Sequence, residues 1–154
     1  MEHWLLFFHL VGALCFFAGA AVAGTLQLAA IRRERPSEIV ALLRLTRAGV
    51  ALVGVGALLT LGFGIGLAEH LGLGLSPAWI QASLGLWLAS MALGGLGGRT
   101  ARHARRLAER LAAEGDEPSA ELRSLVAHRP SLWASYLSTV LLVAIVVLMV
   151  WQPA

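Results

Sequence analysis

Four long runs of apolar residues alternate with shorter charged or glycine-containing segments along the chain. The runs cover about residues 4–31, 50–68, 78–98 and 132–151, and none of them contains Asp, Glu, Lys or Arg. About 20 apolar residues in a helix are enough to cross the hydrocarbon core of a bilayer. The pattern therefore predicts an all-α protein, a transmembrane four-helix bundle in which residues 1–154 form a single membrane domain.

The composition is that of a membrane protein rather than a soluble one. Of the 154 residues, 58% are apolar and 14% are charged, whereas about a quarter of the residues in ordinary soluble domains are charged. The formal charge of +3 comes from the segments between the runs, so it gives no reason to expect nucleic acid as a partner. The lipid bilayer is the expected partner, and the single Cys15 excludes a disulfide within the chain.

The distribution of arginine predicts how the bundle is oriented. All twelve basic residues are arginines, five within 32–47 and seven within 99–129. Because loops rich in Lys and Arg stay on the cytoplasmic side, we expect both segments, including the whole loop 99–131, in the cytoplasm and both termini outside. The expected location is the inner (plasma) membrane of a bacterium. Three tryptophans then fall at the outer edge, where indole rings prefer to sit: Trp4, Trp79 and Trp151.

Proline, serine and glycine predict where the helices begin and end. Pro36 starts a helix that leads into the second span, and Ser76 and Pro77 predict the cap and first position of the third helix. The third helix continues into the arginine-rich segment as far as Gly115. A second short helix is expected to open at 116–118.

Small residues predict close contacts between the helices. In a bilayer, glycine lets neighbouring backbones approach, and the helix survives because unbonded amides are costly there. The sequence predicts helix packing at seven glycines: Gly12, Gly19, Gly24, Gly62, Gly66, Gly94 and Gly98. Faces of this kind also favour association with a second copy or with another membrane protein.

The first run contains an ionisable side chain, His9, at a depth where lipid is expected. An ionisable residue inside a membrane span is a functional-site hypothesis by default. At 1.5 Å per residue, His9 lies about 8 Å inside Trp4, and His70 and Met149 fall closest to its depth. Imidazole and thioether groups are axial haem ligands, and the same pair suits Cu(I). The alternative is that His9 only makes a hydrogen bond across a helix interface.

Residue patterns typical of common catalytic sites are missing from the sequence. It contains no nucleophile–base pair, no paired buried carboxylates and no zinc-ligand spacing, so whether the protein is an enzyme stays open. Charge-free spans argue against an ion-coupled pump. His103 and His128 lie among arginines, and we expect them to be solvated.

The pattern His9-x-x-Gly12-x-x-x-Phe16-x-x-Gly19 resembles the start of a family of uncharacterised bacterial integral membrane proteins with four helices. That family usually opens with H-x-x-G-x-x-x-W-x-G-G, so Phe16 replaces a Trp and Ala18 replaces a Gly. The layout of spans and loops is similar over nearly the whole chain.

The first span is also similar to those of three better-defined groups. They are the copper-resistance D membrane domain, the membrane domain of certain urate oxidases, and the protoporphyrinogen oxidase that resembles a b-type cytochrome. This resemblance implies that His9 is a haem or metal ligand. The last group relies on a Lys, and this chain has none.

Two functions from different classes follow. One is a haem-binding or redox-linked membrane protein with His9 as ligand, haem b being the first candidate and copper the second. The other is a non-catalytic membrane partner, or a small copper or solute transport protein, in which His9 is a packing residue and no cofactor binds.

Overall fold

The computed structural model describes residues 2–152, which form helices and no strands. The helices are α1 (Glu2–Ile31), α2 (Pro36–His70), α3 (Ala78–Ala113), the short α4 (Ala120–Val126) and α5 (Arg129–Trp151). Four segments are long and apolar enough to cross a membrane. They are α1, α2, α3 and the segment Ala120–Trp151, which contains α5. This confirms the all-α fold with four candidate membrane-spanning helices. The orientation of the termini stays a prediction.

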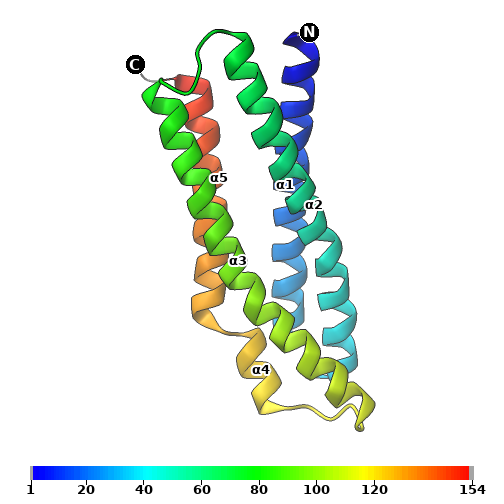
Figure 1. Cartoon of the computed structure of the whole chain (residues 1–154). Helices are drawn as coiled ribbons and strands as arrows, with labels where there is room; N and C mark the ends of the chain where they lie inside the picture. The colour runs from blue at the N-terminus through cyan, green and yellow to red at the C-terminus, as the bar shows by residue number, and fades with distance from the viewer. Residues whose placement is uncertain (1, 153–154) are drawn as a thin grey trace.

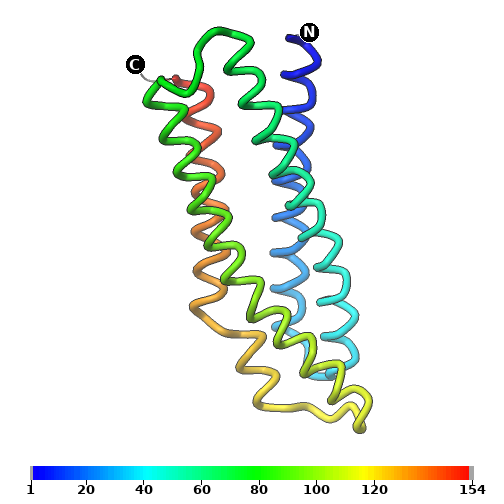
Figure 2. The backbone as a smooth tube through the Cα atoms, in the orientation of Figure 1, coloured from blue at the N-terminus to red at the C-terminus, as the bar shows by residue number. Residues whose placement is uncertain are grey.

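Two antiparallel hairpins make up the bundle (Figure 1). In the first, α1 packs along α2, and in the second α3 packs along α5. The tube in Figure 2 shows that the start of α1, the end of α5 and the α2–α3 connection lie at one end, called here the terminal end. At the opposite, arginine-rich end, α3 crosses toward α2 and α4 closes the gap between the hairpins.

The first hairpin is held by direct contact between backbones. A Cβ added at Gly19 would lie 2.6 Å from the carbonyl oxygen of Gly49, and one at Gly49 would lie 2.9 Å from the carbonyl oxygen of Gly19. Two turns further toward the terminal end, a Cβ at Gly56 would lie 2.7 Å from the carbonyl oxygen of Gly12. Glycine is required at these positions because any side chain would separate the helices.

Hydroxyl groups join the second hairpin. The Ser90 Oγ lies 2.9 Å from the Ser138 Oγ, and the Ser138 Oγ donates to the Ser90 carbonyl oxygen at 3.0 Å. Ser90 is fully buried. A paired hydroxyl of this kind ties two helices together where no water is available to either group.

Two apolar clusters connect the hairpins. The central cluster consists of buried Phe16, Ala57 and Leu142, with Trp87 and Met91 packed against it, and so includes all four long helices. The second cluster lies at the arginine-rich end, where two side chains of α4 are buried against α1, α2 and α3. Its buried members are Ala30, Ile39, Val40, Leu43, Ala104, Ala108, Leu122 and Val126.

A carboxylate joins the α3–α4 loop to the first turn of α2 at the arginine-rich end. The Ser37 backbone N–H and Oγ each donate to Asp116, to Oδ1 and Oδ2 respectively, both at 2.7 Å. Asp116 has a positive φ of 59° and caps the first turn of α2 from another loop. The side-chain hydrogen bond from Ser37, followed by the backbone one, lowers the pKa of Asp116 below its ordinary value of 3.8.

Two predicted helix starts were wrong. Helix α3 begins at Ala78, so Pro77 occupies the cap position that the sequence assigned to Ser76. Helix α4 begins at Ala120, and the Ser119 Oγ accepts from the Leu122 N–H at 3.4 Å. The predicted start at 116–118 failed because Asp116 holds α2 instead of opening a helix of its own.

Candidate functional site around His9

His9 binds the backbone of the neighbouring helix. Its Nδ1 lies 2.8 Å from the carbonyl oxygen of Thr60 on α2, and the residue is half-buried. A carbonyl oxygen can only accept, so Nδ1 carries the proton and donates. In the neutral ring, Nε2 then keeps its lone pair and is free to accept a hydrogen bond or to ligate a metal.

The hydrogen bond depends on two glycines that let His9 reach α2. A Cβ added at Gly64 would lie 2.9 Å from Nδ1 and 3.0 Å from Cε1 of His9. One turn below His9, a Cβ at Gly12 would lie 2.6 Å from the backbone nitrogen of Thr60. The ring therefore rests on the bare backbone of Gly64 while Gly12 holds α1 against α2.

Thr60 and Gly64 were not among the residues predicted for the site. Thr60 was recognisable as the only polar residue in the second span, 50–68. Gly64 had no distinguishing signal, because that span contains five glycines and only the register of α1 against α2 selects one of them.

The two residues predicted as further ligands beside His9, His70 and Met149, lie at different levels in the bundle. His70 is exposed at the end of α2, six residues beyond Gly64 and therefore about 9 Å further along the helix axis. Phe16 of α1 and Leu142 of α5 share the central cluster. His9 lies seven residues from Phe16 on α1, and Met149 lies seven residues from Leu142 on α5, so each is about two turns closer to the terminal end. His9 and Met149 are thus at matching depth, but on different hairpins.

Aromatic rings cluster at the terminal end of the first hairpin. The rings of Phe8 and Phe63 stack with centroids 4.9 Å apart, and Trp4 stacks on Phe8 at 6.2 Å. Trp4 and Phe8 are exposed, so this end of the first hairpin presents an apolar surface.

Within residues 2–152, no group of three or more His, Cys, Asp or Glu side chains is arranged to hold a metal ion. A metal at His9 would therefore take at most one further ligand of these four types from the described part of the chain. Two buried polar atoms in this part of the bundle have no hydrogen-bond partner among the described residues. They are Oγ1 of Thr60, the residue that His9 binds, and Nε1 of Trp87, which packs against the central cluster. Each would gain from an acceptor or donor brought by a ligand or water.

The seven predicted packing glycines have different surroundings. Gly12 and Gly19 make the tight backbone contacts described above. A Cβ at Gly66 would lie 3.6 Å from Leu5 Cδ2, and one at Gly94 would lie 3.6 Å from Ser138 Oγ, both ordinary contacts. At the other three positions an added Cβ would meet nothing within 4 Å, and we correct the expectation of packing within the chain there: Gly24, Gly62 and Gly98.

Comparison with known families agrees with the membrane architecture. The sequence pattern of one family, described as "Predicted integral membrane protein (DUF2269)", matches residues 3–153. The chain belongs to the DUF2269 family. Comparisons of this DUF2269 protein with curated proteins and with solved structures gave no match. Family and fold together make it an integral membrane protein, which lies in the lipid bilayer.

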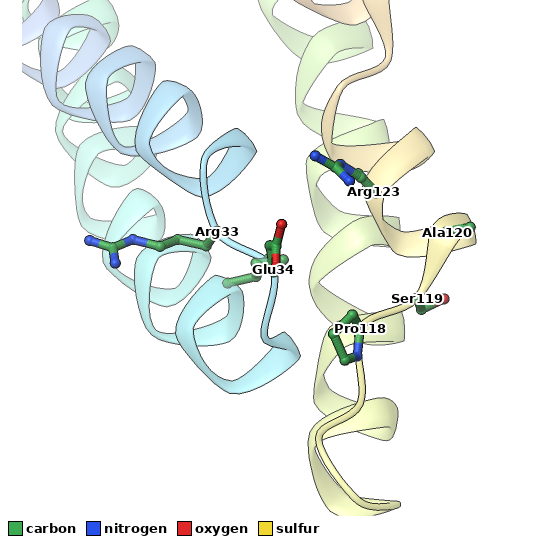
Figure 3. Close-up of a pocket in the computed structure, with 7 residues that line it drawn as sticks. Arg33, Glu34, Pro118, Ser119, Ala120 and Arg123 are labelled. Carbon is green, nitrogen blue, oxygen red and sulfur yellow. The ribbon is translucent and has the colours of Figure 1, made fainter.

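Two cavities of the DUF2269 protein lie away from His9, at the arginine-rich end. The larger, about 270 Å³, lies between the α1–α2 loop and the start of α4 and includes Arg33, Glu34 and Arg123. Figure 3 shows the Arg33 side chain pointing away from α4, and Arg33 pairs with Glu38 at 3.6 Å. The smaller cavity, about 230 Å³, is a shallow depression, widely open to the surroundings, where α3, α4 and α5 meet.

Proposed function

We propose that this DUF2269 protein binds haem b in the membrane and takes part in electron transfer, and that Nε2 of His9 would hold the haem iron. The observation that carries the proposal is the hydrogen bond from His9 Nδ1 to the Thr60 carbonyl oxygen at 2.8 Å. Histidines that bind metals almost always donate their other ring N–H to a carbonyl, carboxylate or water, which fixes the tautomer and the ring orientation. His9 has this arrangement.

The surroundings of His9 suit a haem. Bound haem supplies one-electron chemistry, and the chain would bind it, orient it and exclude water. Phe8 precedes His9 on α1, Phe63 precedes Gly64 on α2, and their apolar rings stack with centroids 4.9 Å apart. Met149, at matching depth on α5, is the preferred second ligand, whereas His70 is exposed and about 9 Å further along α2. The resemblance of the first span to haem- and copper-linked membrane groups supports the same role for His9.

Copper is the alternative metal for the same residues. A thioether and an imidazole are suitable ligands for Cu(I). A protein loaded with Cu(I) would be colourless, so metal analysis rather than absorbance distinguishes it from a haem protein.

A non-catalytic role as membrane partner, or as a small transport protein, is the second candidate function. It is favoured by the same contact, because a cross-helix hydrogen bond over the bare backbone of Gly64 is by itself a sufficient reason for a histidine at position 9. Such a bond contributes about 0.6–2 kcal/mol to the association of two helices in a membrane.

The deciding experiment is the absorbance spectrum of the full-length protein purified from a haem-replete membrane. We expect a Soret band that His9→Ala removes and Met149→Leu shifts. Gly64→Ala should also shift the band, because the added Cβ would lie 2.9 Å from Nδ1 and displace the ring. Gly62→Ala is the matched control, since its Cβ would meet nothing within 4 Å.

Two results would decide against haem. Protein without a Soret band that loses copper in the His9→Ala variant would favour the copper site. Colourless and metal-free protein, in which His9→Ala only lowers thermal stability, would leave the helix-tying role of His9 and the non-catalytic function.

A further inference from the structure

The smaller cavity at the arginine-rich end has the chemistry of an anion site. It is lined by Arg99, Thr100 and His103 of α3, by Leu125 of α4 and by His128 at the start of α5. One permanent cation, two protonatable imidazoles and a hydroxyl therefore face a volume of about 230 Å³, and no carboxylate from residues 2–152 lines it. The larger cavity differs, because Glu34 lies between its two arginines.

A chain of hydrogen bonds orients His128 in this cavity. Ser131 Oγ donates to Thr100 Oγ1 at 2.7 Å, so the same oxygen accepts from His128 Nδ1, 2.9 Å away. With its Nδ1 proton engaged, His128 uses Nε2 toward any ligand, and a protonated Nε2 donates to an anion. His128 also occupies the cap position of the 23-residue α5, where the positive end of the helix dipole favours a negative charge.

The basic groups of the cavity are available to a ligand. The ion pairs among residues 2–152 involve Arg33, Arg44 and Arg105, and none of them involves Arg99. Arg99 and His103 are exposed to the surroundings of the protein. A guanidinium group without a carboxylate partner matches the geometry of a phosphate group.

The position of the cavity identifies the source of the phosphate. It lies where the charge-free part of α3 ends, at the level at which a bilayer has its headgroups. Leu96, three residues before Arg99 on α3, is 54% exposed, and Trp133, near the start of α5, is 71% exposed. Exposed apolar and indole side chains at this level contact lipid tails and the membrane interface.

We propose that this cavity binds the phosphate of an anionic phospholipid, held by Arg99, His103 and His128, with the acyl chains lying along the exposed apolar surface of α3. The site is independent of His9 and of the orientation of the bundle. Its occupant would join α3, α4 and α5, which otherwise meet there around the cavity.

Native mass spectrometry of the full-length protein in mild detergent tests this proposal with three probes. Phosphatidylglycerol should bind at least fivefold more tightly than zwitterionic phosphatidylcholine, and inorganic phosphate at millimolar concentration should not displace it. Arg99→Gln should weaken phosphatidylglycerol binding about fivefold, the size expected for one basic side chain beside an anionic headgroup.

Matched variants separate the cavity from general charge attraction. Arg102→Gln removes a neighbouring exposed arginine that does not line the cavity, and we expect less than a twofold effect. His103→Gln changes an exposed cavity residue, so its folding should be normal, and it should weaken binding as Arg99→Gln does. Equal losses for Arg99→Gln and Arg102→Gln would overturn the proposal, and so would binding of inorganic phosphate without any preference for the anionic lipid.

Discussion

The substitution Gly56→Ala tests whether α1 and α2 touch through their backbones. The added Cβ would lie 2.7 Å from the carbonyl oxygen of Gly12 and would also contact the backbone nitrogen of Phe16. Real Cβ atoms essentially never approach another atom to under 3.0 Å. Both opposing atoms belong to the backbone of α1 and cannot rotate away, so the two helices must move apart.

The expected magnitude follows from two opposing effects. Overpacking of this kind costs about 1–3 kcal/mol, and the higher helix propensity of alanine offsets about 0.5–1 kcal/mol of that cost. We therefore expect Gly56→Ala to lower the free energy of unfolding by about 1–2 kcal/mol. Gly54→Ala, two residues earlier on α2, is the matched control: its Cβ would meet nothing within 4 Å, and it should leave stability unchanged or raise it.

Thermal unfolding in mild detergent, followed by circular dichroism, measures the difference. A loss of 1–2 kcal/mol corresponds to a fall in Tm of about 2–8 °C for a chain of this length. If the Gly56→Ala protein were as stable as the Gly54→Ala protein, α1 and α2 could not be in backbone contact at this level, and the derived position of His9 against Thr60 would lose its support.

Three further predictions concern other parts of the fold. Ser90→Ala and Ser138→Ala should each destabilise the second hairpin, and a double-mutant cycle in detergent should give a coupling of about 0.6–2 kcal/mol; additive losses would contradict the paired hydroxyls. Hydrogen bonds from Ser37 of α2 lower the pKa of Asp116. The contribution of Asp116 to the stability of the fold should therefore be complete above about pH 3.8, the ordinary pKa, and should decline as the pH falls further through the lowered pKa. The Tm of the Asp116→Ala protein should lack this decline. In a cysteine-free background, Leu73→Cys should react with an impermeant thiol reagent on intact spheroplasts and Glu114→Cys should not; the reverse labelling would invert the predicted orientation.

The sequence by itself determined the four apolar helices and the position of His9 along the first of them. An apolar run of about 20 residues has no alternative to a helix in hydrocarbon, because each unpaired backbone amide would cost several kcal/mol there. Local pattern is then sufficient, and the helices at Glu2–Ile31 and Arg129–Trp151 include the predicted runs 4–31 and 132–151. The position of His9 along α1 likewise needed only the rise per residue.

Only the tertiary structure decided which residues of these helices meet. Gly54 and Gly56 are equivalent by local sequence, yet a Cβ at Gly54 is free and one at Gly56 collides with α1. Thr60 is the only polar residue of the second span, but His9 binds its backbone carbonyl oxygen, a group that every residue has, so no side-chain pattern could predict this hydrogen bond. Asp116 caps α2 from 79 positions away. In each case the contact depends on the register between two helices or loops, and that register is set by the packing of the whole bundle rather than by local sequence.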